Sequence, residues 1–170
     1  MVALAGLGAG AVQLEALPHG HGQRFQAGHV GQRTAAVRRE RQLQDARETR
    51  VLADRLEQVT LRTAFTDEDR AFIQRCPMFF IATADARGQP DCSYKGGLPG
   101  FVRVLDDRTL AIPDYDGNGM YFSMGNIDAN PEFGLLFIDF ERPFRLRVQG
   151  RARISRDPAL TAQFAGSELV

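Results

Sequence analysis

The feature of this sequence that most limits its fold is a series of short strand patterns between residues 78 and 154. Turn residues separate them at close spacing, which is typical of a small antiparallel barrel or sandwich. The pattern predicts six strands, over 78–84, 91–95, 101–105, 109–113, 133–140 and 144–154. We therefore expect a mainly β fold of the α+β class, with helices flanking the sheet.

Helical patterns stand before, within and after this series. From about residue 38 the apolar residues recur at helical spacing. Thr66 predicts the start of a second helix, because it is a good N-cap and Asp69 completes a capping box. Further helical patterns cover parts of 116–130 and 158–169.

The length of 170 residues is that of one folded domain with room for an extension. Residues 1–37 are rich in Gly, Ala, Gln and His and show no sustained periodicity. We interpret them as a disordered or non-native N-terminal extension, and residues 38–170 as the folded domain. The apolar run over 2–12 is too short for a membrane span, which needs about 20 apolar residues.

Charge and histidine content exclude several classes of protein. With 21 basic and 21 acidic residues the net charge is zero, so we expect no nucleic-acid partner and no membrane partner. All three histidines fall within the first thirty residues, which argues against catalytic triads and His-ligated metals elsewhere. We expect Cys76 and Cys92 to be reduced, buried thiols of a cytoplasmic protein.

The last predicted strand places four arginines on one face by its alternation, namely Arg145, Arg147, Arg151 and Arg153. The opposite face would be apolar, from Phe144 to Ile154. Four like charges repel one another unless anions or partner carboxylates neutralise them. Anion binding, an interface and a solvated outer face all remain open for this strand.

Ser93, Tyr94 and Lys95 are followed by two glycines, which allow a ligand to approach the backbone. Together they offer a hydroxyl, an aromatic plane and a positive charge, which suit a phosphorylated aromatic ligand. The alternative is an ordinary surface lysine at the end of a strand.

The loop over 113–120 has two interpretations. It matches the front half of an EF-hand calcium loop through Asp114, Asp116, Asn118 and Gly119. The twelfth position, which should hold a bidentate acid, is Gly125, so the calcium interpretation lacks its main ligand. In the other interpretation, a glycine turn opens a helix whose free N–H groups bind phosphate.

Several motifs in this order resemble the pyridoxamine 5′-phosphate oxidase-like, FMN-binding split-barrel family. The likeness runs from about Gln44 to about Pro158. It is carried by the segments 79–85, 88–91, 93–97, 113–120, 126–131, 134–140 and 145–150.

The resemblance implies a six-stranded Greek-key split barrel and a homodimer with FMN in the cleft between subunits. The chain ends at Val170 before another strand pattern, so the last strand of the barrel is expected to be missing. Carried over by position, the FMN-binding residues would be Ser93, Tyr94, Lys95, Asp114, Asn118, Gly119, Met120, Arg145 and Arg147.

The implied function is that of an FMN-dependent oxidoreductase of this class acting on an unidentified small molecule. The flavin would supply the chemistry, and neither a catalytic residue nor a metal site is predicted. The alternative is a non-catalytic module that binds FMN or another cofactor, and a deazaflavin or haem in place of FMN is left open. The family's C-terminal substrate-binding signature has no counterpart before Val170.

Overall fold

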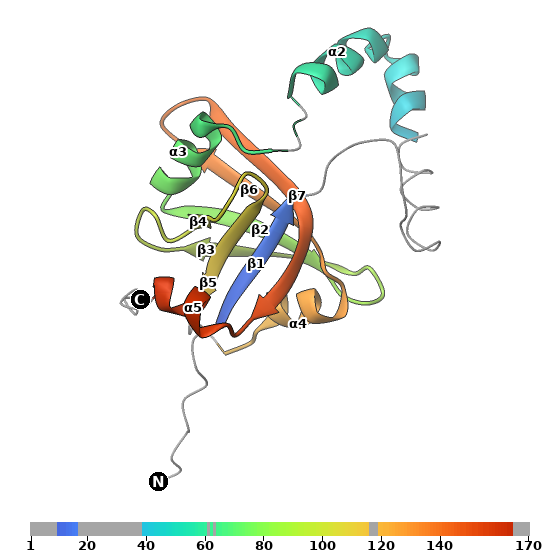
Figure 1. The fold of residues 1–170 in the computed structure, drawn as a ribbon. Helices are drawn as coiled ribbons and strands as arrows, with labels where there is room; N and C mark the ends of the chain where they lie inside the picture. The colour runs from blue at the N-terminus through green and yellow to red at the C-terminus, as the bar shows by residue number, and fades with distance from the viewer. Residues whose placement is uncertain (1–9, 17–38, 61, 63, 116–118, 165–170) are drawn as a thin grey trace. The chain divides into compact units, whose positions relative to one another are not determined.

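The computed structural model describes residues 10–16, 39–60, 62, 64–115 and 119–164 (Figure 1). Contacts divide the chain into two compact units. The barrel unit comprises residues 1–17 and 64–170, and the helical unit comprises residues 18–63.

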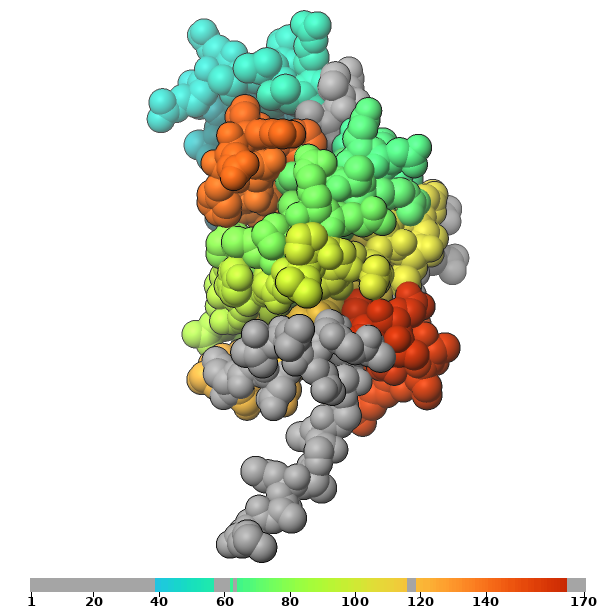
Figure 2. Space-filling view, turned by 90° about the vertical axis from the view of Figure 1, so that its left-hand side faces the viewer, coloured from blue at the N-terminus to red at the C-terminus, as the bar shows by residue number. Residues whose placement is uncertain are grey.

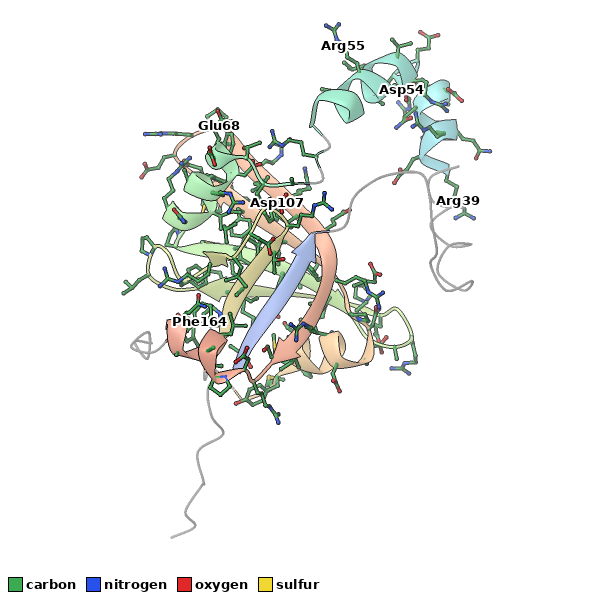
Figure 3. All side chains as sticks on the ribbon, in the orientation of Figure 1. Arg39, Asp54, Arg55, Glu68, Asp107 and Phe164 are labelled. Atoms are coloured by element: carbon green, nitrogen blue, oxygen red, sulfur yellow. The ribbon has the colours of Figure 1, made fainter. Side chains whose placement is uncertain are left out.

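The helical unit contains two helical segments, residues 39–46 and α2 (Arg50–Thr60). A hydrogen-bonded ion pair between Arg41 and Asp54 joins them. Figure 3 shows Asp54 turned toward residues 39–46 and Arg55 on the other side of α2. The helical pattern predicted from about residue 38 is therefore confirmed.

The barrel unit is built on one open antiparallel sheet of seven strands in the order β3-β2-β6-β7-β1-β5-β4. Every pair of neighbouring strands is antiparallel. The strands are β1 (Gly10–Ala16), β2 (Met78–Ala84), β3 (Pro90–Gly96), β4 (Arg103–Val104), β5 (Thr109–Asp114), β6 (Glu132–Asp139) and β7 (Phe144–Ser155). The predicted mainly β fold, an antiparallel split-barrel sheet with flanking helices, is confirmed, with seven strands in place of six.

The additional strand is β1, which lies between β7 and β5 and is paired with both. It falls inside residues 1–37, the segment that the sequence predicts to be an extension. The alternation there is only four residues long (Val12 to Glu15), which is too short to stand out as a strand pattern. β7 therefore pairs with β6 over residues 144–151 and with β1 over residues 150–155, where a missing last strand was expected to leave an open edge. The domain boundary at residue 37 stays a prediction.

Three helical elements flank the sheet: α3 (Asp67–Arg75), α4 (Phe122–Ala129), and α5 (Pro158–Thr161) with the 3-10 turn η1 (Ala162–Phe164). The predicted capping box is confirmed. The Asp69 N–H donates to Thr66 Oγ1 at 3.2 Å, and the Thr66 N–H donates to Asp69 Oδ2 at 2.9 Å. Figure 3 shows Glu68 on α3 and Phe164 beside α5.

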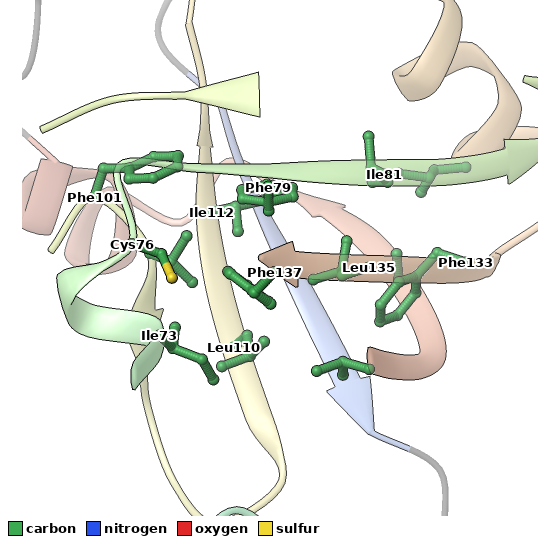
Figure 4. Packing of buried hydrophobic residues seen from close by; sticks show 14 of the residues in the cluster. Ile73, Cys76, Phe79, Ile81, Phe101, Leu110, Ile112, Phe133, Leu135 and Phe137 are labelled. Atoms are coloured by element: carbon green, nitrogen blue, oxygen red, sulfur yellow. The ribbon is translucent and has the colours of Figure 1, made fainter. Parts of the chain in front are cut away.

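The core lies between the inner face of the sheet and helices α3 and α4 (Figure 4). Phe79 is at its centre: its ring stacks on Phe101 at 5.7 Å between centroids and meets Phe137 at 5.3 Å. The α3 helix adds Phe72 and Ile73, both buried. The space-filling view shows side chains of α3 and of the following strands closing over this side of the unit (Figure 2).

Gly97→Ala is expected to lower the free energy of unfolding by about 1–3 kcal/mol, the usual cost of overpacking. A Cβ at Gly97 would lie 2.7 Å from Phe101 Cγ, and that ring is buried. The measurement is urea unfolding followed by circular dichroism.

The matched control is Gly125→Ala in α4, where a Cβ would meet no heavy atom of the described residues within 4 Å. Alanine there should raise the stability by up to about 1 kcal/mol through helix propensity. A Gly97→Ala variant as stable as Gly125→Ala would contradict the packing described.

Candidate functional site

Strand β3 divides the predicted site residues between the two faces of the sheet. Ser93 pairs with Ile81 of β2, whose side chain is fully buried in the core. Lys95 pairs with Phe79, which is buried as well. Because cross-strand partners point to the same face, Ser93 and Lys95 lie on the inner face, and Tyr94 lies on the outer face.

On the inner face a chain of polar contacts joins β3 to α4. The Ser123 hydroxyl donates to Ser93 Oγ at 3.1 Å, and the Ser93 hydroxyl donates to Asp91 Oδ2 at 3.2 Å. Ser123 is buried, whereas Ser93 and Asp91 are half-buried. One turn further along α4, Asn126 Nδ2 donates to Thr83 Oγ1 of β2 at 3.0 Å, which holds the helix on this face.

The charge of Lys95 acts on the Asp114 carboxyl, which is 19 positions away in sequence. Burial raises the pKa of the Asp114 carboxyl above its ordinary value, and the positive charge of Lys95 partly opposes that rise. Asp114 ends β5 and is half-buried. We refer to Asp91, Ser93, Lys95 and Ser123 as the polar cluster.

The first turn of α4 begins beside this cluster without a side-chain cap. Its N-cap residue, Tyr121, has a left-handed backbone with φ 49° and makes no capping hydrogen bond. Gly119, two residues earlier, has φ 70°. The uncapped N–H groups at a helix start favour an anion.

The loop before α4 is described only in part. Asn118 and Asp116 lie outside the described residues, so the calcium loop and the predicted role of Asn118 stay predictions. Met120 is exposed next to α4. Within the part of the chain that the structure describes, no group of three or more His, Cys, Asp or Glu residues could hold a metal ion.

Arg145 and Arg147 lie on the outer face, with Tyr94 and away from the polar cluster. Arg147 pairs with Leu136 of β6, and Arg145 pairs with Ile138. Both arginines are exposed. The predicted set is therefore split: Ser93 and Lys95 lie on the inner face, whereas Tyr94, Arg145 and Arg147 lie on the outer face.

Two details of the sequence interpretation need correction. The inner face of β7 is apolar as expected, but it is not buried throughout, because Phe144 and Ile154 at its ends are 44% and 39% exposed. Cys76 is buried as expected, but Cys92 is exposed on the outer face, opposite Ala82. Strand β3 is at the edge of the described sheet and has β2 as its one neighbouring strand. Side chains on its outer face, such as Cys92, are therefore packed against β2 on one side only.

Ser123 was not among the predicted site residues. The sequence does predict its position, as an early residue of a helix that follows a glycine turn. Its contact with Ser93, which is 30 positions away, could not be predicted from the sequence, because it forms only when α4 packs on β3.

Comparison with known proteins shows the family of this chain. The family model described as pyridoxamine 5′-phosphate oxidase matches residues 65–169, which is more than half of the chain. This chain belongs to that family. The match covers all of the barrel unit from α3 onward, including every residue of the polar cluster.

Two solved structures of HupZ from Group A Streptococcus, at 1.98 and 1.70 Å resolution, are also similar to this chain. Each is 30% identical, with a TM-score of 0.41, over 51% of this chain. The matched parts make up 66% and 63% of those chains, so this chain spans less than two thirds of either. No curated protein is significantly similar to this chain.

The donor set of the polar cluster fits a phosphate monoester. It offers one ammonium, two hydroxyls and the uncapped first turn of α4, which are the groups that bind phosphate in proteins. The carboxyl group of Asp91, which accepts from Ser93, opposes an anion at the same place. No helix of the described residues is long and apolar enough to cross a bilayer.

Proposed function

We propose that this protein is a flavoprotein that binds FMN at the polar cluster and acts as an oxidoreductase on a small molecule. The observation that carries the proposal is the contact of Ser123 with Ser93 beside Lys95, which joins the phosphate-type donors of β3 to the start of α4. The membership of the chain in the pyridoxamine 5′-phosphate oxidase family supports it.

In this proposal the residues of the cluster bind and orient the phosphate. Lys95 supplies the positive charge and the first turn of α4 supplies N–H donors. The Ser93 hydroxyl, which donates to Asp91 Oδ2 in this structure, would donate to the phosphate instead, and Ser123 would keep its hydrogen bond to Ser93 Oγ. The bound flavin would supply the electron transfer, and the protein would position it.

We further propose a homodimer formed through the outer face of the sheet. Helices α3 and α4 place their buried residues in the inner core, and on the outer face Leu160 of α5 packs against Ala111 of β5. One cross-strand row of the face is Tyr94, Phe80, Leu136 and Arg147, from β3, β2, β6 and β7.

The composition of this row suits an interface between copies. Tyr94 is 61% exposed, and Phe80 and Leu136 are only half-buried. Tyrosine and arginine are enriched at interfaces, and a half-buried apolar row gains from being covered.

Leu136→Arg is expected to convert the dimer to a monomer, because a charge would replace the apolar centre of the row. Light scattering after gel filtration measures the mass. The matched control is Leu98→Arg, in an exposed loop where the side chain is 68% exposed. A wild-type protein that is monomeric at all concentrations would contradict the proposed interface.

The FMN proposal is tested by adding FMN to the purified protein, removing free flavin and recording the visible spectrum. We expect a yellow protein whose flavin absorbance is bleached by a reductant. A protein that stays colourless after reconstitution would refute FMN binding.

The alternative is a non-catalytic module that binds FMN or another cofactor. A flavin that dithionite reduces, but that no nicotinamide nucleotide or small-molecule donor reduces, would favour this alternative. We also propose a cytoplasmic location, which cell fractionation would test.

A further inference from the structure

We propose that Asn126 is a positioning residue of the phosphate site, whose hydrogen bond to Thr83 holds the first turn of α4 beside Ser93. The inference rests on the proposed function, in which FMN supplies the phosphate. It adds to that site a residue that acts through the helix and does not itself touch the ligand.

Side-chain hydrogen bonds join α4 to two neighbouring strands of the sheet. Asn126 Nδ2 donates to Thr83 Oγ1 of β2 at 3.0 Å, and the Ser123 hydroxyl donates to Ser93 Oγ of β3 at 3.1 Å. Because residues three apart in a helix lie on the same face, Asn126 and Ser123 both face the sheet. The two contacts therefore hold α4 at two points that are one helical turn apart.

Thr83 is a fixed anchor for the Asn126 contact. Its side chain is buried, and it pairs with Asp91 of the polar cluster across β2 and β3. Strand β2 lies inside the sheet, with β3 on one side and β6 on the other. Its position is set by both neighbours, so a hydrogen bond from Asn126 to Thr83 places the helix relative to the polar cluster.

Two features of α4 make its first turn depend on such a contact. The helix has only eight residues, and its N-cap residue, Tyr121, makes no side-chain capping hydrogen bond. Short helices are marginal unless tertiary packing stabilises them. Met124 and Ile127 do pack in the core, but apolar burial is non-directional and fixes the rotation of a helix less well than a hydrogen bond does.

The residue type at position 126 agrees with this role. Asparagine is a weak helix former, because its side chain competes with the backbone for hydrogen bonds. Asn126 is nevertheless inside α4, where it is half-buried and bonded to the sheet. Its side chain therefore contributes to the packing of the helix and not to the formation of the helix.

The consequence for the ligand is specific to its phosphate. In the proposed function the first turn of α4 contacts the phosphate of FMN and no other part of it. A shift of α4 would separate Ser123 from Ser93 and turn the N–H groups of the first turn away from the phosphate. Loss of the Asn126 contact should therefore weaken the binding of FMN but not that of riboflavin.

The test is fluorescence titration of the wild-type protein and Asn126→Ala with FMN and with riboflavin. We expect Asn126→Ala to bind FMN roughly three- to tenfold more weakly, the effect of one neutral hydrogen bond, and to bind riboflavin unchanged. Thr83→Val keeps the shape of the side chain but removes the acceptor, so it should have the same effect. Thr83→Ser keeps the hydroxyl and should retain the wild-type affinity.

Two further comparisons separate positioning from a general loss of stability. In a Ser123→Ala background, Asn126→Ala should reduce FMN affinity by a smaller factor than in the wild type, because both changes act on the same contact. The matched control is Asn130→Ala, the same change at the C-cap of α4, where Nδ2 donates to the Asp85 carbonyl at 3.4 Å. Its FMN affinity should equal that of the wild type. Urea unfolding gives the stability of each variant.

The outcomes separate this proposal from the proposed function. If the wild type binds FMN and Asn126→Ala binds it equally well, or loses FMN and riboflavin affinity equally, the role of Asn126 is overturned while FMN binding stands. A loss of FMN affinity that follows stability in every variant, Asn130→Ala included, overturns it as well. If Asn126→Ala does not fold, a Thr83→Val variant that binds FMN as well as Thr83→Ser does overturns it.

Inorganic phosphate is the probe if the wild type does not bind FMN. Phosphate that stabilises the wild type against heat more than it stabilises Asn126→Ala would mean that the FMN proposal fails and the role of Asn126 at a phosphate site stands. If phosphate stabilises neither protein, both proposals are overturned.

Discussion

Replacing Phe79 with alanine is expected to lower the free energy of unfolding by about 3–5 kcal/mol, the range for a buried Phe→Ala change. Phe79 is 1% exposed and lies between the rings of Phe101 and Phe137. Its removal would leave a cavity that strands on either side cannot close. Since small domains are stable by only about 5–15 kcal/mol, we expect a large drop in the unfolding midpoint or loss of the folded protein.

Phe140→Ala is the matched control for Phe79, because it is the same chemical change at a side chain that is 73% exposed. An exposed substitution of this kind usually changes stability by less than about 0.5 kcal/mol. Denaturant unfolding of both variants measures the two values. Equal losses would mean that Phe79 is not at the centre of the core.

Lys95→Ala is expected to weaken FMN binding by about 1.5–3 kcal/mol, the worth of a hydrogen bond to a charged group. That corresponds to a rise in Kd of roughly 10- to 150-fold. Lys95 is the only lysine in the chain, and it lies on the inner face with Ser93. Fluorescence titration with FMN gives the Kd of each variant.

Two controls show whether Lys95 acts on the phosphate. Lys95→Arg keeps the positive charge and should keep most of the affinity. Riboflavin lacks the phosphate, so its weaker binding should not respond to Lys95→Ala. An FMN affinity that Lys95→Ala leaves unchanged would remove Lys95 from the site, and an equal loss for riboflavin would assign it to another part of the ligand.

Local patterns predicted the elements that depend on neighbouring residues in the chain. The capping box at Thr66, strand β2 and the hairpin from β2 to β3 needed only side-chain preference and alternation, both visible within a few residues. The alternation of β7 also placed its arginines on the outer face. It failed at the ends of the strand, where exposure depends on which neighbours cover Phe144 and Ile154.

The candidate site was predictable only in part, since its members meet across the fold. The hydroxyl of Ser93 and the ammonium group of Lys95 indicated a phosphate-binding site. The family resemblance added Arg145 and Arg147 to it. No local pattern could show that the arginines lie on the other face of the sheet from Lys95. Their separation follows from the strand order β3-β2-β6-β7 and its register, which only long-range pairing establishes.

The sequence by itself determined a mainly antiparallel β domain with capped helices, and the family to which it belongs. It did so because alternation, caps and motif order are properties of short stretches of chain. The tertiary structure alone decided that residues 10–16 form a strand between β7 and β5 and that Ser123 supports Ser93. Each of these joins segments far apart in the chain, and its free energy comes from pairing, burial and charge that exist only once the sheet has formed.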